Sequence, residues 1–177
     1  MKHTHERCHG LPFRWPDRPF TVVLVEPEIP QNTGNIARLC AATGSPLHLV
    51  GPLGFHITSS HLKRAGLDYW DSVNLTRHAS WDEFTAALAG LTPTPRLVFF
   101  STSGKTAYTG IRYQAGDCLV FGSESKGLPE GLLAGTQAQV LAIPMQEEHV
   151  RSLNLATSVG IVLYEALRQA QGAPGVA

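Results

Sequence analysis

The stretch that decides the fold is CLVFGSESKGLPEGLL, residues 118–133. Its apolar run, Cys118 to Phe121, has the length and composition of a buried strand, and it ends at a loop of glycines, serines and an acid–base pair. A loop of this kind at a strand end is typical of a binding site. The spacing of Gly122 and Gly127 matches neither the dinucleotide fingerprint nor the phosphate-binding P-loop. The ligand is therefore expected to be of another kind.

Strand-like and helix-like segments alternate from Thr21 onward, which predicts an α/β domain with a largely parallel sheet flanked by helices. We expect strands at 21–25, 47–50, 96–101, 118–121 and 139–143, and a weaker one near 73–76. We expect helices at 34–43, 59–66, 81–89, 129–134 and 153–170. Residues 21–170 would form a single domain, with residues 1–20 as a loose leader and residues 171–177 as a loose tail.

The composition limits the class of protein. A chain of 177 residues with 43% hydrophobic content can bury one ordinary core. Because 14 Lys and Arg balance 14 Asp and Glu, any contact with nucleic acid has to come from a local patch. The three cysteines are far apart, which favours plain thiols in a reducing compartment. No apolar run has the length of a signal peptide or a membrane span, so we expect a cytoplasmic protein without membrane contact.

The leader carries four residues that are able to chelate a metal: His3, His5, Cys8 and His9. Nothing around them would orient the ligands. We therefore interpret the segment as a weakly basic tail and expect no metal.

The helix expected at 153–170 is apolar on two sides. One stripe consists of Leu155, Val159, Val162, Leu163 and Ala166, and most of a second consists of Leu153, Ala156, Gly160, Ile161 and Leu167. The first face would pack on the sheet, and the second on another copy of the chain, with Gly160 allowing close approach. We therefore expect a homodimer; the alternative is a helix buried inside a monomer, which suits a larger domain.

The loop after the first expected strand leads into a helix at which Asn32 or Thr33 is placed to act as the cap. Free amides at such a helix start form an anion site, and Asn35 and Arg38 lie together on the face of its first turns. These residues place a guanidinium near a phosphate-sized spot. The alternative is that Asn32 only caps the helix and that Arg38 only pairs with a nearby acid.

The loop after the strand expected at 139–143 leads into the long last helix. Pro144 has no amide hydrogen, so it ends the strand and leaves the following backbone groups free for a ligand. Ser152 and Asn154 stand at the mouth of the helix, where either residue is able to cap it.

Three motifs in this order resemble those of the SPOUT superfamily of RNA methyltransferases. They are PEIPQNTGNIARLCAATG (27–44), LVFGSESKGLP (119–129), and IPM (143–145) followed by RSLNLATSVGIVLYEA (151–166). The chain is most similar to the small tRNA 2'-O-methyltransferases that act on a wobble cytidine or uridine, and LKRAGLDYW at 62–70 also resembles that subfamily. The resemblance covers about residues 21–168.

The resemblance implies a C-terminal trefoil knot that binds S-adenosyl-L-methionine, and a homodimer that completes the site. The residues that would bind this cofactor are Phe100, Gly122, Glu124, Gly127, Ile143, Met145, Ser152 and Leu153. The reaction would transfer the sulfonium methyl to a ribose 2'-hydroxyl, with Arg38, Asn35, Ser152 and Asn154 as the catalytic corner. A guanidinium stays charged, so Arg38 would grip the adjoining phosphate and stabilise the developing alkoxide rather than act as a base. Glu124 would pair with either Arg38 or Lys126.

The expected substrate is the anticodon stem-loop of a tRNA, held by Lys63, Arg64, Arg77, Lys105 and Arg151. The chain departs from the usual family pattern at Ser123, Ser125 and Lys126, and at Ala156 and Thr157. Two alternatives stay open: a ribose methyltransferase for ribosomal RNA or another tRNA position, and a knotted RNA-binding protein without catalysis. A nicotinamide-binding reductase is excluded, because no glycine fingerprint follows the first strand.

Overall fold

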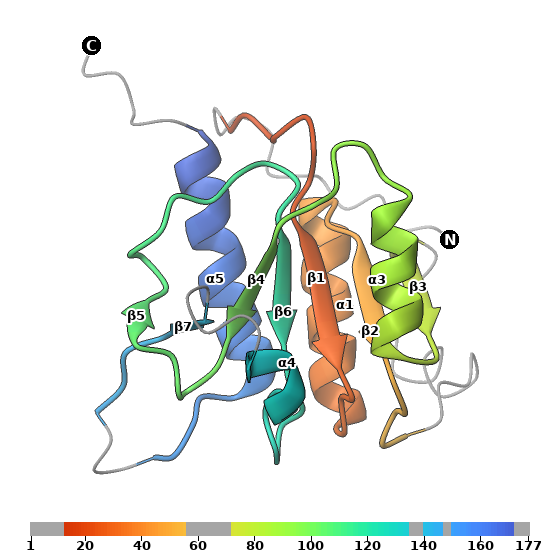
Figure 1. Cartoon of the computed structure of the whole chain (residues 1–177). Helices are drawn as coiled ribbons and strands as arrows, with labels where there is room; N and C mark the ends of the chain where they lie inside the picture. Colours follow the sequence, from red (N-terminus) through yellow and green to blue (C-terminus); the bar gives the residue numbers. More distant parts are fainter. Residues whose placement is uncertain (1–12, 56–71, 135–139, 147–149, 172–177) are drawn as a thin grey trace, which may run out of the picture.

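The computed structural model describes residues 13–55, 72–134, 140–146 and 150–171. In this part of the chain a seven-stranded sheet carries helices on both faces (Figure 1). The strands are β1 (Thr21–Val25), β2 (Leu47–Val50), β3 (Leu75–His78), β4 (Leu97–Phe100), β5 (Thr106–Ala107), β6 (Cys118–Phe121) and β7 (Val140–Ala142). The helices are α1 (Pro30–Thr43), α3 (Trp81–Ala89), α4 (Glu130–Ala134) and α5 (Leu155–Ala170).

The strand order is β3-β2-β1-β6-β4-β7-β5, and the paired strands run parallel. The predicted α/β class is therefore confirmed. The chain builds the sheet outward from β1 in one direction and then continues with β4 on the other side. The loops at the carboxyl ends of β1, β6 and β4 thus meet where the winding reverses, at the lower end of Figure 1. Open α/β sheets bind ligands at such a point.

Strand β7 lies between β4 and β5, although both of these strands precede it in the chain. The chain therefore returns after β6 and places β7 between two strands that were formed earlier in the sequence. The trefoil knot stays a prediction of the resemblance.

Alternation along the strands gives the sheet two apolar faces. Val22 and Leu24 point to the cluster that contains α1 and α5, whereas Val23 and Val25 point to the cluster that contains α3. In Figure 1, α3 and α4 lie in front of the sheet and α1 and α5 behind it. Because both faces are covered, the strands read as continuous apolar runs, which made them visible in the sequence.

Some predicted boundaries were wrong. Helix α1 begins at Pro30 instead of residue 34, and its N-cap, Ile29, makes no side-chain cap. Proline suits the first helical position because its missing amide hydrogen is not needed there. Strand β3 runs two residues later than expected, and β5 was missed because two residues carry no periodicity. The expected helix 59–66 and the tail 172–177 lie outside the described residues.

Helix α5 buries the whole first stripe of the prediction against the sheet. Its second stripe is only partly buried within one chain, although Leu167 is fully covered. Part of that stripe faces α1, because a Cβ placed on Gly160 would lie 4.0 Å from Leu39 Cδ2. Tyr164 beside it is 51% exposed. A homodimer stays a prediction, with a smaller surface to cover than the sequence suggested.

The last residues of the expected leader take part in the core. Phe20 is fully buried, and Phe13 packs against the α1–α5 cluster. The amide of Thr21 donates to the carbonyl of Asp117 at 3.0 Å. The folded region therefore begins before residue 21.

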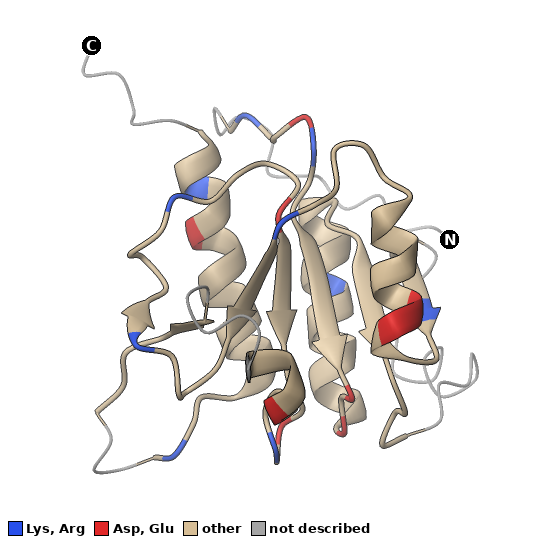
Figure 2. Cartoon of the chain, viewed as in Figure 1, with Lys and Arg blue, Asp and Glu red and all other residues tan. Residues whose placement is uncertain are grey.

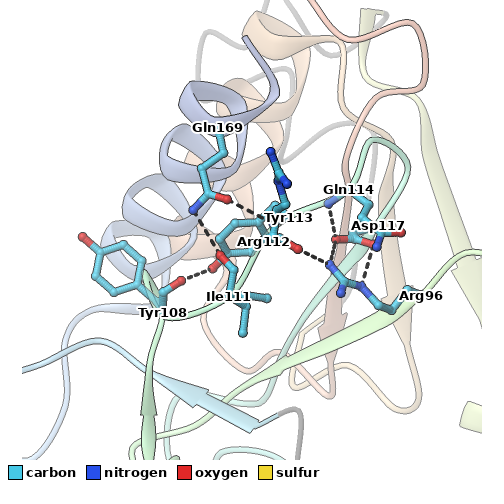
Figure 3. A network of polar contacts seen from close by, with 8 residues as sticks. All are labelled: Arg96, Tyr108, Ile111, Arg112, Tyr113, Gln114, Asp117 and Gln169. Carbon is cyan, nitrogen blue, oxygen red and sulfur yellow. Dashed lines mark hydrogen bonds and ion pairs between the residues drawn. The ribbon is translucent and has the colours of Figure 1, made fainter. Parts of the chain in front are cut away.

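A polar network ties the amino ends of the strands together (Figure 3). Arg96 Nε donates to Asp117 Oδ1 at 3.0 Å, and a guanidinium nitrogen donates to the carbonyl of Arg112 at 2.8 Å. The amide of Tyr113 donates to Gln169 Oε1 at 3.1 Å. The connection between β5 and β6 is thus fastened both to β4 and to the end of α5.

Candidate functional site

A cavity of about 800 Å³ opens at the carboxyl ends of the strands. Its walls come from the loops after β1, β4, β6 and β7 and from the start of α5. The volume lies within the range of small-molecule and cofactor pockets. Phe100 and Phe121, whose stacked rings lie 4.8 Å apart, form part of an apolar wall, while serines from the loops supply polar groups.

The loop after β6 is closed by its own backbone. The amide of Ser123 donates to the carbonyl of Gly127 at 3.1 Å, and the amide of Gly127 donates back at 2.9 Å. A Cβ on Gly122 would lie 2.0 Å from the carbonyl carbon of Gly127, and Gly127 has a positive φ of 70°. Gly122 is therefore required by this close contact within the loop itself.

The carboxylate of Glu124 reaches across to the turn between β1 and α1. It accepts from the amide of Glu28 at 2.8 Å, from the amide of Ile29 at 3.2 Å and from Asn32 Nδ2 at 2.9 Å. The amides at the expected anion site are therefore bound by a carboxylate of the chain itself. The sequence suggested Arg38 or Lys126 as the partner of Glu124. The observed partners are neither of these two residues.

Asn32 joins the loops of all three motifs. Besides its bond to Glu124, its Oδ1 accepts from Asn154 Nδ2 at 2.9 Å, while Asn154 Oδ1 caps α5 by accepting from Ala156 N at 2.9 Å. The prediction that Ser152 or Asn154 caps this helix is confirmed, and the capping residue is Asn154. The prediction that Asn32 is a cap was wrong, because its buried side chain is engaged with residues 92 and 122 positions away.

The eight residues expected to bind the cofactor line the cavity, as do Arg151 and Asn154. Asn35 and Arg38 do not belong to the described lining; both are exposed on α1. The four residues of the expected catalytic corner are therefore split between the cavity mouth and the outer face of α1.

The expected RNA-binding residues do not form one patch in a single chain. Arg77 lies in β3 and Lys105 beside β5, at opposite edges of the sheet. Six strand spacings put the two edges on the order of 30 Å apart. Figure 2 shows basic positions at both ends and both edges of the fold. Arg151 borders the cavity, while Lys63 and Arg64 lie outside the described residues.

Other reactive groups in the described chain do not suggest a second chemistry. Burial raises the pKa of the Cys40 thiol to about 12 and that of Cys118 to about 12, so both stay protonated at neutral pH. Among the described residues, no group of three or more His, Cys, Asp or Glu side chains is arranged to hold a metal ion. Within the same residues, every helix is too short or too polar to cross a lipid bilayer.

Comparison with known proteins identifies relatives along most of the chain. A tRNA (cytidine(34)-2'-O)-methyltransferase of Methylovorus glucosotrophus is 48% identical over 151 residues, which cover 85% of this chain and 95% of that protein. A structure solved for insight into the 2-OH methylation of C/U34 on tRNA is 50% identical, with a TM-score of 0.79, and covers 88% of this chain and 99% of that one.

A more distant structural relative contains a ligand. The AdoMet-bound rRNA methyltransferase of Sinorhizobium meliloti is 28% identical, with a TM-score of 0.73, and the match covers 88% of this chain and 58% of that one. The SpoU rRNA Methylase family matches residues 19–164, which include all three motif loops around the cavity. The chain therefore belongs to the SpoU rRNA methylase family.

Proposed function

We propose that this protein is an S-adenosyl-L-methionine-dependent tRNA methyltransferase that methylates the ribose 2'-hydroxyl of the wobble nucleotide, cytidine or uridine 34. The names of relatives at about half identity over most of the chain support the reaction and the substrate. The observation that carries the proposal is that the three motif loops gather around the same cavity.

The cavity fits the cofactor in size and in chemistry. Phe100, Ile143, Met145 and Leu153 offer apolar surface for a purine ring and for the methylene groups of the methionine chain, and the loop residues offer backbone and hydroxyl groups for the polar parts of the cofactor. When bound, the cofactor supplies an electrophilic methyl group on its sulfonium sulfur. The protein then has to place the oxygen of the 2'-hydroxyl in line with that methyl group, help to remove the hydroxyl proton, and stabilise the charge that develops on the oxygen.

Arg38 and Asn154 divide this task. The side chain of Asn154 is held by its bond to Asn32 and by its cap on α5, so its amide group has a fixed orientation at the cavity mouth. Arg38 grips the phosphate beside the ribose and stabilises the developing alkoxide.

A homodimer accounts for the position of Arg38. This residue and Asn35 lie on the exposed side of α1, outside the described lining of their own cavity, and the partly exposed stripe of α5 lies next to α1. A second copy packed on this surface would cover the stripe. It would also bring the exposed face of α1 of one protomer toward the cavity of the other. Sedimentation velocity combined with activity tests this proposal: a monomer that methylates tRNA would contradict it.

Transfer of labelled methyl groups tests the function as a whole. The protein is incubated with labelled S-adenosyl-L-methionine and tRNA from cells that lack it, and nuclease mapping locates the label. Label on the ribose of nucleotide 34 is the expected result. Label in ribosomal RNA with none in tRNA would keep the cofactor and the reaction but replace the substrate.

A further inference from the structure

Glu28 makes a bidentate contact with the loop that forms one wall of the cavity. It lies in the turn between β1 and α1, 97 residues from Ser125 in the chain. Its Oε1 accepts from the Ser125 hydroxyl at 2.7 Å, and its Oε2 accepts from the Ser125 amide at 3.1 Å. Ser125 lines the cavity, whereas Glu28 is outside the described lining. Glu28 therefore contacts this wall without itself belonging to the described lining of the cavity.

The contact is reciprocated. While Glu28 reaches from the β1–α1 turn to the loop after β6, Glu124 reaches from that loop to the same turn. We call Glu28, Glu124, Ser125 and Asn32 the two-loop clamp. Each carboxylate accepts backbone and side-chain hydrogens, and bonds of this kind to a charged acceptor are stronger than neutral ones.

The two acids of the clamp hold different parts of the loop. The backbone bonds between Ser123 and Gly127 close its base. Its tip, Ser125 and Lys126, is exposed. Apart from a bond of the Lys126 amide to Ser123 Oγ at 3.3 Å within the loop, the hydrogen bonds between this tip and other described residues are those with Glu28. Removing the Glu28 carboxylate would free the tip while leaving the base and Glu124 in place.

We propose that Glu28 is a positioning residue for the cofactor: it holds the tip of the loop after β6 in the shape that the cofactor requires. A loop ordered in advance has less conformational entropy to lose when a ligand binds, so affinity rises without a new ligand contact. The proposal rests on the proposed function for the identity of the ligand.

Glu28→Gln is the test variant. A glutamine is neutral, so its bonds to the Ser125 amide and hydroxyl are no longer charge-assisted and are about half as strong as those of the carboxylate. Glu83→Gln is the matched control, because Glu83 also accepts a loop amide, that of Ala79 at 2.7 Å, but beside α3. Both variants remove one charge and replace a charge-assisted bond to a loop amide with a weaker neutral one.

Hydrogen exchange and calorimetry give the first two readouts. In Glu28→Gln, the amides of Ser125 and Lys126 should exchange about tenfold faster, and the dissociation constant of S-adenosyl-L-methionine should rise about tenfold. Glu83→Gln should change neither quantity. With Glu28 already replaced, Ser125→Ala should weaken cofactor binding by less than it does in the wild type, because the two side chains act as one pair.

Steady-state kinetics separates positioning from general damage. The KM for the cofactor should rise with the dissociation constant, while kcat and the KM for tRNA change by less than about threefold. Unchanged exchange in Glu28→Gln would overturn the clamp itself. Faster exchange with unchanged cofactor affinity would overturn the positioning role. A wild-type protein that binds no S-adenosyl-L-methionine would overturn the proposed function, and the exchange of Ser125 would still decide whether the clamp holds the loop.

Discussion

The two ends of the sheet are held together in different ways. At the amino ends, Arg96 pairs with Asp117, whose side chain is 2% exposed, and the network continues to α5 through Gln169. At the carboxyl ends, the two-loop clamp joins partly exposed loops around a cavity. A buried ion pair is costly to break, whereas bonds near solvent open more easily. The fold is thus fixed at one end, and the other end is shaped for a ligand.

The strongest test of this contrast concerns chemistry at the carboxyl end. Arg38→Ala should reduce methyl transfer by about a thousandfold, because a charge that stabilises the transition state is removed. Cofactor affinity should stay within about twofold, since Arg38 lies outside the described lining of the cavity. Single-turnover transfer and calorimetry measure the two quantities. Unchanged transfer would remove Arg38 from the mechanism.

The second test concerns the shape of the carboxyl end. Gly122→Ala puts a methyl group where Gly127 lies 2.0 Å away, so the loop after β6 has to move. Cofactor affinity should fall by about a hundredfold, measured by calorimetry. Gly131→Ala in α4 is the control, because a Cβ there meets nothing within 4 Å. Equal affinities of the two variants would show that the loop tolerates displacement.

The third test disrupts the polar network at the amino ends of the strands. Arg96→Ala leaves the buried Asp117 carboxylate without its charged partner and should lower the free energy of unfolding by about 3 kcal/mol. The more exposed pair of Arg168 and Glu165 gives the control, since Arg168→Ala should lower the free energy of unfolding by much less than Arg96→Ala does. Urea denaturation compares the two. Cofactor affinity of the folded Arg96→Ala protein should match the wild type; a large loss would show that the two ends are coupled.

The smallest effect is expected at the edge of the sheet, between the two ends. Burial, and then the charge of His78, lower the pKa of His48 from 6.5 to about 4, and the two rings share a hydrogen bond of 2.8 Å. Between these pH values the unfolded chain binds the proton more readily, so stability is complete above pH 6.5 and falls as the pH approaches 4.

Solvent exposure of His48 limits this loss to about 1 kcal/mol. Urea denaturation of the wild type and of His48→Leu at pH 7.5 and pH 5 measures it. The pH dependence should be weaker in the variant by that amount. An equal dependence in both proteins would assign the acid sensitivity to other groups.

Local patterns were enough to locate most of the framework. The apolar runs of β1, β2, β4 and β6 are continuous in sequence because parallel strands are buried on both faces. The apolar stripe on α5 and the left-handed C-cap Gly44 after α1 likewise depend on residues that are close together in the sequence. Strand β5 escaped because two residues that pair with β7 carry no pattern of their own.

The amino-acid sequence by itself determined the α/β class, the main strands and eight of the residues that line the cavity, because apolar periodicity and the three motifs are local. Only the tertiary structure decided that Asn32 joins the motif loops, that Glu124 binds the turn before α1, and that Glu28 supports Ser125. It also decided that Arg77 and Lys105 lie at opposite edges of the sheet. These relations depend on which strands become neighbours, and a polar side chain carries no local sign of a partner about a hundred residues away.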